Sequence, residues 1–340
     1  MKILIYGDNH FSQYSSIVRR NGEKYSLRLE NEIKSVNWAE RLSENEGCDM
    51  IVVLGDFFDS SNLNSMELTA LHEIKWAKQP HKFLVGNHEL GLRNLQISSA
   101  HILNMVPNVE IIDSPKTEFD TLFNVQLCYI PYIFEDDRKS IEDYINTPFS
   151  DCRRVIFSHN DIKGIQMGAF ISKAGFEIPD IEKNCDLYIN GHLHNGSKVS
   201  NKIINCGNLT GQNFGEDAFK YDHVALVLDT SNFQIAVFEN PYALNFYKID
   251  FLTGIHKLDI KNNSVLSVIC NDEDVDNIRK ELDSDDRIIE YKLTVHRNIS
   301  NIKIDNNIVV TDHLKMFSDF IVNNMENTDI VAEELTEVCK

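Results

Sequence analysis

The stretch Met1–His10, MKILIYGDNH, decides the fold class. Its apolar segment Lys2–Tyr6 is typical of a buried strand, and it ends at a glycine that is followed by polar residues. The same order, an apolar segment and then a polar cluster, recurs at Met50–Leu54, Lys82–Val85, Val155–Phe157 and Leu187–Ile189. We therefore expect five strands that carry polar side chains at their carboxyl ends.

The sequence between the first predicted strands has the periodicity of amphipathic helices. Leu29, Ile33 and Val36 lie at helical spacing, and Leu68 and Leu71 follow the same pattern further along. Alternation of strands and helices predicts a layered α/β architecture. Three later segments separated by turn residues are expected to be antiparallel strands that complete a second sheet: Ile203–Cys206, Val224–Leu228 and Gln234–Glu239.

The 340 residues are more than one hydrophobic core usually holds. We expect a large domain over 1–240, a capping module over 241–298, and a linker with a helical tail over 299–340. Within the module, Val265–Cys270, Val275–Leu282 and Ile288–Val295 predict a strand, a helix and a second strand.

Composition excludes several classes of protein. The 52 acidic and 33 basic residues give a net charge of −19, which argues against nonspecific attraction to polyanions. The chain has no apolar stretch long enough for a membrane span or a signal peptide, so we expect a cytoplasmic protein, in the host cell if a phage encodes it. The seven cysteines are scattered without a CxxC pair, which argues against a disulfide framework or a cysteine zinc site.

The polar clusters contain the residues with which proteins bind metals. In order, they supply Asp8 and His10, then Asp56 and Asp59, then Asn87, His88 and Glu89, then His159, and finally His192 and His194. Residues two apart in an extended segment point the same way, so Asp8 and His10 can serve one site. Carboxylate, carboxamide and imidazole without thiolate suit manganese, iron or zinc in a catalytic site.

A two-metal site explains the set economically. One aspartate can bridge two cations roughly 3.5–4 Å apart, and such a pair clamps a phosphoryl group for in-line attack. An isolated Gly-Asp or a lone histidine is more often a turn or a satisfied polar residue than a ligand. The fixed order of all the clusters together is what indicates a site.

In this order the motifs resemble those of the calcineurin-like metallophosphoesterases, DxH, GDxxD, GNH[DE], H and GHxH. The resemblance spans about residues 1–240 and implies a two-sheet αββα sandwich. It also implies two divalent ions, with manganese expected. Metal one would be held by Asp8, His10, Asp56 and His194, and metal two by Asp56, Asn87, His159 and His192.

The resemblance also implies roles for three residues that do not bind metal. His88 corresponds to the histidine that contacts the scissile phosphate and protonates the leaving oxygen. Glu89 stands where an aspartate often orients that histidine, and its longer side chain is a departure from the pattern. Asp59 is expected to support the site.

Within this superfamily the chain most resembles the SbcD-type DNA repair nucleases, in particular the compact recombination endonuclease subunits of T-even-like bacteriophages. The further signs are the segment Gly207–Gly211 leading to Phe214–Glu216, the module near 264–295 and the amphipathic end. The resemblance implies a manganese-dependent exonuclease and single-strand endonuclease. It implies DNA and an SbcC-type coiled-coil ATPase as partners, leaves a homodimer open, and gives no role to a membrane.

Two surfaces are expected to serve these partners. Basic residues after the first motif could contact DNA phosphates, namely Arg19, Arg20, Lys24 and Arg28, although a solvated helix start explains them equally well. An apolar stripe in the tail could bind the ATPase, or could pack on the protein's own core; it consists of Leu314, Phe317, Phe320 and Ile321.

Two other functions remain open at the sequence level. A phosphomonoesterase or protein phosphatase of the same fold would use the same motifs, but it would not need the module after 241 or the apolar tail. A non-catalytic scaffold of this fold would not need the complete ligand set, and it could dispense with His88.

Overall fold

The computed structural model describes residues 1–145, 152–167, 170–250 and 258–296. The chain divides into two compact units, Met1–His296 and Arg297–Lys340, and the described residues all belong to the first. The expected linker and tail, with Leu314, Phe317, Phe320 and Ile321, therefore lie outside the described residues. The expected division at residue 240 stays a prediction.

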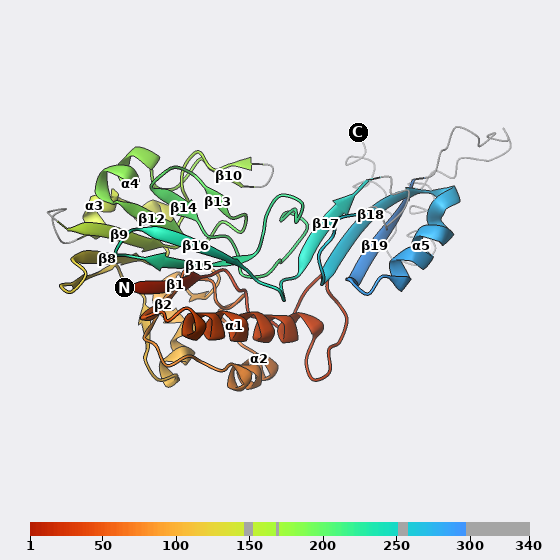
Figure 1. Ribbon diagram of the computed structural model, residues 1–340, viewed down its shortest axis with the longest axis horizontal. Coiled ribbons are helices and arrows are strands. Elements are labelled where there is room, and N and C mark those ends of the chain that lie inside the picture. The colour runs from red at the N-terminus through yellow and green to blue at the C-terminus, as the bar shows by residue number, and fades with distance from the viewer. Residues whose placement is uncertain (146–151, 168–169, 251–257, 297–340) are drawn as a thin grey trace, which may run out of the picture. The chain divides into compact units, whose positions relative to one another are not determined.

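Two six-stranded sheets form the centre of the first unit (Figure 1). Sheet one has the order β16-β15-β1-β2-β3-β6, and sheet two has the order β13-β14-β12-β9-β8-β7. The strands of sheet one are β1 (Lys2–Tyr6), β2 (Met50–Val53), β3 (His81–Leu84), β6 (Val109–Ile112), β15 (Val224–Asp229) and β16 (Gln234–Glu239). The strands of sheet two are β7 (Lys116–Asp120), β8 (Val125–Ile130), β9 (Arg153–Ser158), β12 (Leu187–Asn190), β13 (Ser197–Lys198) and β14 (Ile203–Asn205).

Helices cover the outer face of each sheet (Figure 1). Sheet one is covered by α1 (Leu27–Asn45) and α2 (Ser65–Ala70), which continues into the 3-10 helix η1 (Leu71–Glu73), and sheet two by α3 (Ile141–Tyr144) and α4 (Ile178–Asn184). Other short segments are the 3-10 helices η2 (Ser99–Met105) and η3 (Glu135–Asp137) and the hairpin strands β4 (Leu90–Gly91), β5 (Asn94–Ser98), β10 (Gln166–Met167) and β11 (Phe170–Ile171).

The hydrophobic cores follow these layers. Ile3 and Val52 of sheet one meet Leu127 and Val155 of sheet two in the central core. Alternate residues of β1 and β2 point outward and pack against α1, whose Leu29, Ile33 and Val36 form the predicted buried face. The side chain of Ser26 caps this helix by accepting a hydrogen bond from the Leu29 amide. The αββα sandwich is thus confirmed.

Sheet membership corrects one sequence expectation. The five strands predicted before polar clusters are present, but β1, β2 and β3 lie in sheet one, and β9 and β12 lie in sheet two. Of the three later strands, β14 pairs in parallel with β12, whereas β15 and β16 extend sheet one through antiparallel pairing of β15 with β1. They therefore do not complete one sheet together, because β15 satisfies the open edge of β1.

A three-stranded parallel sheet follows the sandwich in sequence. Its strands are β17 (Asn245–Ile249), β18 (Ser264–Asn271) and β19 (Ile288–His296), and α5 (Val275–Ser284), preceded by the 3-10 helix η5 (Asp272–Asp274), packs on one face. The predicted strand, helix and strand of this module are present at the expected places. Its other face contacts Val18 and Leu244, which ties the small sheet to the sandwich.

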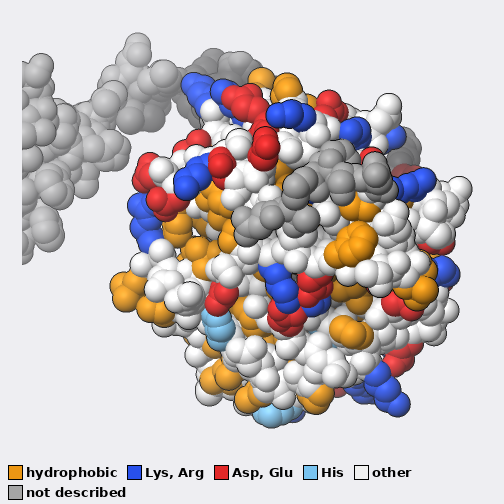
Figure 2. Space-filling view, turned by 90° about the vertical axis from the view of Figure 1, so that its left-hand side faces the viewer, with side chains coloured by type: hydrophobic (Ala, Val, Ile, Leu, Met, Phe, Trp, Pro, Cys, Tyr) orange, Lys and Arg blue, Asp and Glu red, His pale blue; other side chains and the backbone are white. Residues whose placement is uncertain are grey.

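The described residues include no helix long and apolar enough to cross a bilayer. The six cysteines in the described part of the chain are free thiols. Acidic and basic side chains intermingle over the face shown in Figure 2, so the negative net charge is not gathered there.

Candidate metal centre

All seven predicted ligands lie together, at the edge of the sandwich where strands of both sheets have their carboxyl ends. Turns after β1, β2 and β3 bring Asp8, His10, Asp56 and Asn87, and turns after β9 and β12 bring His159, His192 and His194. Potential ligand atoms lie within 4.8 Å of one another in the groups Asp8–His10–His194 and Asp56–His159–His192. Each group draws on both sheets, so the site depends on the packing of the whole sandwich.

The first half of the site presents two imidazole nitrogens to each other. His10 Nε2 lies 3.0 Å from His194 Nε2. Each ring places its other nitrogen on a carboxylate, since His10 Nδ1 is 2.9 Å from Asp59 Oδ1 and His194 Nδ1 is 2.7 Å from Glu216 Oε1. Because a carboxylate only accepts, both Nδ1 atoms donate, so in the neutral rings both Nε2 atoms carry lone pairs. A cation would satisfy both.

The second half repeats this arrangement. His159 Nδ1 donates to Leu54 O at 2.6 Å, which leaves its Nε2 lone pair 3.1 Å from Asp56 Oδ2 and 3.2 Å from Asn87 Oδ1. Burial alone would lower the pKa of His159, but the Asp56 carboxylate more than offsets this and raises it to about 9. In the metal-free protein, a proton on His159 Nε2 thus lies between the ring and the oxygens of Asp56 and Asn87. The donor set fits a divalent cation equally well.

Glycines allow the ligands to approach one another. A Cβ at Gly86 would lie 2.1 Å from Asp56 Oδ1, and a Cβ at Gly55 would lie 2.5 Å from His159 Nδ1. Gly55 also has a φ of +98°, which side chains rarely adopt. Glycine is therefore required at both places for steric reasons, and for backbone reasons at Gly55.

Asp59, and not Glu89, is the carboxylate beside His88. His88 Nδ1 lies 3.3 Å from Asp59 O and 3.7 Å from Asp59 Oδ1. Glu89 turns away and is fully buried, with Oε1 accepting from the Phe58 amide at 3.1 Å and Oε2 accepting from the Gly86 amide at 2.8 Å. The expectation that Glu89 orients His88 is corrected: its longer side chain joins the backbones of two ligand loops.

The sequence reasoning missed two carboxylates at the site. Glu216 is 3% exposed and holds His194, and Asp161 Oδ1 lies 3.3 Å from His192 Nε2. Glu216 stands in the segment 207–216 that the resemblance had marked, and Asp161 follows His159 by two residues. Proximity to motifs was the available signal, but only the fold shows which imidazole each carboxylate meets.

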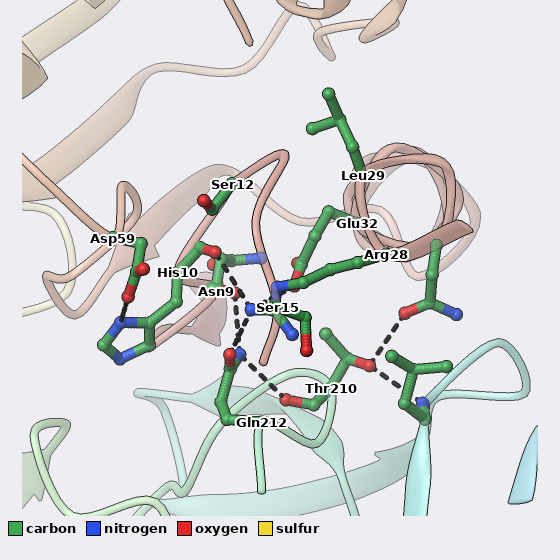
Figure 3. Close-up of polar contacts among 12 residues, drawn as sticks. Asn9, His10, Ser12, Ser15, Arg28, Leu29, Glu32, Asp59, Thr210 and Gln212 are labelled. Atoms are coloured by element: carbon green, nitrogen blue, oxygen red, sulfur yellow. Dashed lines mark hydrogen bonds and ion pairs between the residues drawn. The ribbon is translucent and has the colours of Figure 1, made fainter. Parts of the chain in front are cut away.

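The basic residues separate into two groups. Arg19, Arg20 and Lys24 are exposed, and Arg20 and Lys24 lie beside Glu290 and Glu73. Arg28 is only 2% exposed, although it contributes to the lining of the cleft beside the site, so the DNA contact expected for it stays a prediction. Its guanidinium lies beneath the first ligand loop (Figure 3).

A cleft of about 250 Å³ opens beside the first half of the site. It is lined by the potential metal-site residues His10 and His194, by Asp59 and His88, and by Tyr14, Ser15, Ser16, Arg28, Gln212 and Asn213. The His88 side chain is 43% exposed, so it is accessible to a ligand in the cleft.

The calcineurin-like phosphoesterase family matches residues 1–196, and the chain belongs to this family. It is 24% identical over 201 residues to the putative phosphoesterase 078R of Invertebrate iridescent virus 3; the match covers 52% of this chain and 56% of that protein. The chain thus spans little more than half the length of this curated relative.

Solved structures are more distant. TT1561 of Thermus thermophilus aligns with a TM-score of 0.42 at 10% identity, covering 70% of this chain and 98% of that one. A dimetal phosphatase from Danio rerio aligns with a TM-score of 0.40 at 13% identity, covering 67% and 91%. These similarities are too distant to add to the family assignment.

Proposed function

We propose that the protein is a manganese-dependent DNA nuclease that hydrolyses phosphodiesters at a two-metal site. Family membership establishes the broader class, a metal-dependent phosphoesterase. The observation that carries the metal site is the convergence of potential ligand atoms: two imidazole nitrogens face each other at 3.0 Å, and a third faces two oxygens. Without a positive charge between them, such groups repel each other.

The residues would divide between two cations. Asp8, His10 and His194 would hold the first, Asn87, His159 and His192 the second, and Asp56 both. When bound, the two cations would supply an activated water and charge stabilisation for in-line displacement at phosphorus. His88 at the cleft would hold a proton for the leaving sugar oxygen, and Asp59 would keep its ring in place.

Two observations support an extended substrate. The resemblance to SbcD-type nucleases covers the motifs, the segment 207–216 and the small module. In addition, the cleft shares Ser16 with a second cavity of about 540 Å³, whose charged lining residues are Arg19, Lys292 and Glu290. Two basic side chains beyond the scissile position suit the next phosphates of a strand.

The same resemblance supports an SbcC-type ATPase as partner. The residues proposed to bind it lie in 299–340, outside the described part of the chain. We propose that the pair acts in DNA recombination and repair.

A phosphomonoesterase or protein phosphatase is the second candidate. The cleft of about 250 Å³ beside His88 has room for a single phosphate group, which is what such an enzyme requires. A non-catalytic scaffold is less well supported, because the chain retains every ligand together with His88.

Comparison of substrates tests the proposal. Full-length protein loaded with manganese would be given linear duplex DNA, single-stranded circles and 4-nitrophenyl phosphate, with and without a coexpressed SbcC-like ATPase. We expect DNA degradation that is lost in Asp56→Asn, and aryl phosphate turnover at least 100-fold less efficient in kcat/KM. Efficient hydrolysis of the monoester with intact DNA would contradict the nuclease proposal and favour the second candidate.

A further inference from the structure

The first ligand loop has an unfavourable backbone. Asp8 and His10 have φ angles of +50° and +51°, a region that costs free energy for residues other than glycine. Such conformations persist only where the surroundings hold them. On one side, Asp8 N donates to Gly55 O at 3.0 Å and His10 N donates to Asp56 O at 2.9 Å.

Two side chains hold the carbonyls of the same loop from below (Figure 3). Arg28 Nη2 donates to His10 O at 3.1 Å, and Gln212 Nε2 donates to Asn9 O at 2.9 Å. Arg28 Nη2 also donates to Gln212 Oε1, so the two side chains hold each other. Arg28 comes from α1 and Gln212 from the segment after β14, far apart in sequence.

The segment around Gln212 also reaches the other histidine of this half of the site. Asn208 N donates to His194 O at 3.1 Å, and Glu216 binds His194 Nδ1. The backbone N–H of Gln212 donates to Glu216 Oε2 at 2.6 Å. The position of His10 is therefore coupled to that of His194 through Arg28, Gln212 and Glu216.

We propose that Arg28 and Gln212 are positioning residues for metal one, and that Arg28 does not bind the substrate. They fix the Asn9–His10 carbonyls and thereby the direction of His10 Nε2 toward His194. The inference rests on the metal site of the proposed function. It assigns a role to the segment 207–216 and replaces the DNA contact expected for Arg28.

Manganese titration of the full-length protein by calorimetry tests this proposal, with Gln212→Met and Arg28→Met as variants. We expect wild type to bind two ions, and each variant to lose at least tenfold in affinity for one of them and less than twofold for the other. Second-sphere partners of metal ligands commonly have effects of this size. Steady-state kinetics at saturating manganese should show a lower kcat with KM within twofold.

Loss of Arg28 alone leaves a buried carboxyl behind, because Glu32 Oε1 lies 3.1 Å from Arg28 Nη2 and Glu32 is fully buried. The double variant Arg28→Met/Glu32→Leu removes both polar groups and guards against a simple failure to fold. It should show the same selective loss of one manganese.

Arg154→Met is the matched control. Arg154 is also buried, and it also donates to a glutamine, Gln126 Oε1 at 2.8 Å, and to a backbone carbonyl, Asn184 O at 3.1 Å. It lies at the amino end of β9, opposite the site, so its loss should lower stability and leave both manganese affinities unchanged.

Three results would overturn the proposal. Wild-type affinity for both ions in Arg28→Met/Glu32→Leu and Gln212→Met would show that the contacts are merely structural. A raised KM with unchanged manganese binding would assign Arg28 to the substrate. Absence of manganese binding in the wild type would remove this inference and the proposed function together.

Discussion

His88 is the residue whose surroundings most resemble those of a proton donor. Its ring contacts that of His10 edge-on at 4.5 Å, its amide donates to Asp56 Oδ1 at 2.9 Å, and its side chain borders the cleft. The ring also forms a third group of potential ligand atoms with His10 and Asp56, all within 4.8 Å of one another, so it lies directly beside both halves of the site.

We expect His88→Ala to reduce kcat by about 10²–10⁴-fold, the range typical of a lost general acid. Manganese stoichiometry should remain that of wild type, because each proposed cation keeps all the ligands predicted for it. Single-turnover DNA cleavage with parallel metal analysis measures both. Near-normal cleavage with both metals bound would remove His88 from catalysis.

Glu216 is expected to control the metal affinity of His194. In Glu216→Gln, the amide can still accept a hydrogen bond from His194, but the charge that raises the basicity of the ring is gone. The dissociation constant for manganese should rise by about 10–100-fold. Glu110→Gln, which loses a carboxylate of β6 that pairs with Lys82 and Lys116, is the control and should bind manganese normally. Equal affinities in the two variants would show that Glu216 does not tune the site.

At the scale of elements, α1 is anchored to sheet one by a buried polar group. Glu40 accepts hydrogen bonds from Tyr6 Oη at 2.9 Å and the Ala77 amide at 2.8 Å, and its Oε2 lies 2.9 Å from His81 Nε2. His81 Nδ1 also lies 2.8 Å from Gln79 O, so both ring nitrogens face oxygen atoms. The contacts join α1 to β1 and β3.

Glu40→Leu should therefore lower the free energy of unfolding by about 3–5 kcal/mol, because it leaves the buried Tyr6 hydroxyl, Ala77 amide and His81 ring without the Glu40 oxygens, and each buried group that loses its partner costs about 1–3 kcal/mol. Urea unfolding followed by circular dichroism gives this value. Glu44→Leu, on the exposed face of the same helix, should change it by less than about 0.5 kcal/mol. A similar effect of the two substitutions would contradict the anchoring role.

The same helix carries a carboxyl that titrates unusually. Burial raises the pKa of Glu32 from 4.5 to about 8, although the positive charge of Arg28 opposes this. At a pH between 4.5 and about 8, the unfolded chain has released the Glu32 proton and the folded chain keeps it. This group therefore lowers the free energy of unfolding as the pH rises through that range. Relative to Glu32→Gln, wild type should lose a few kcal/mol of unfolding free energy between about pH 5 and about pH 8. A pH-independent difference between the two proteins would contradict this titration.

Over the whole molecule, periodicity predicted the strands and α1 because burial imposes it on each element by itself. It could not predict that β15 and β16 join sheet one, since pairing depends on which edge is open. The convergence of the seven predicted ligands could be expected, because each follows the carboxyl end of a strand and the family motifs occur in that order. Glu216, Gln212 and the orientation of Glu89 were not, because these contacts form only after distant segments meet.

Because the ligands come from both sheets, metal binding should stabilise the sandwich as a whole. An ion that binds only the folded state stabilises it by about 2.7 kcal/mol when its free concentration is 100 times its dissociation constant. We expect chelation to lower the Tm of wild type and to have a smaller effect on Asp56→Asn, in which the shared carboxylate is lost and metal binding is weaker. Differential scanning calorimetry of both proteins, with manganese and with chelator, measures this. An unchanged Tm in wild type would contradict the coupling of metal and fold.

The claim on which the function depends is that two cations share Asp56. Electron paramagnetic resonance of the full-length protein loaded with manganese, together with metal analysis, addresses it most directly. We expect two ions per chain with an exchange-coupled spectrum, and a spectrum of isolated ions in Asp56→Asn. One ion or fewer per chain, or two ions without coupling in the wild type, would contradict the two-metal site.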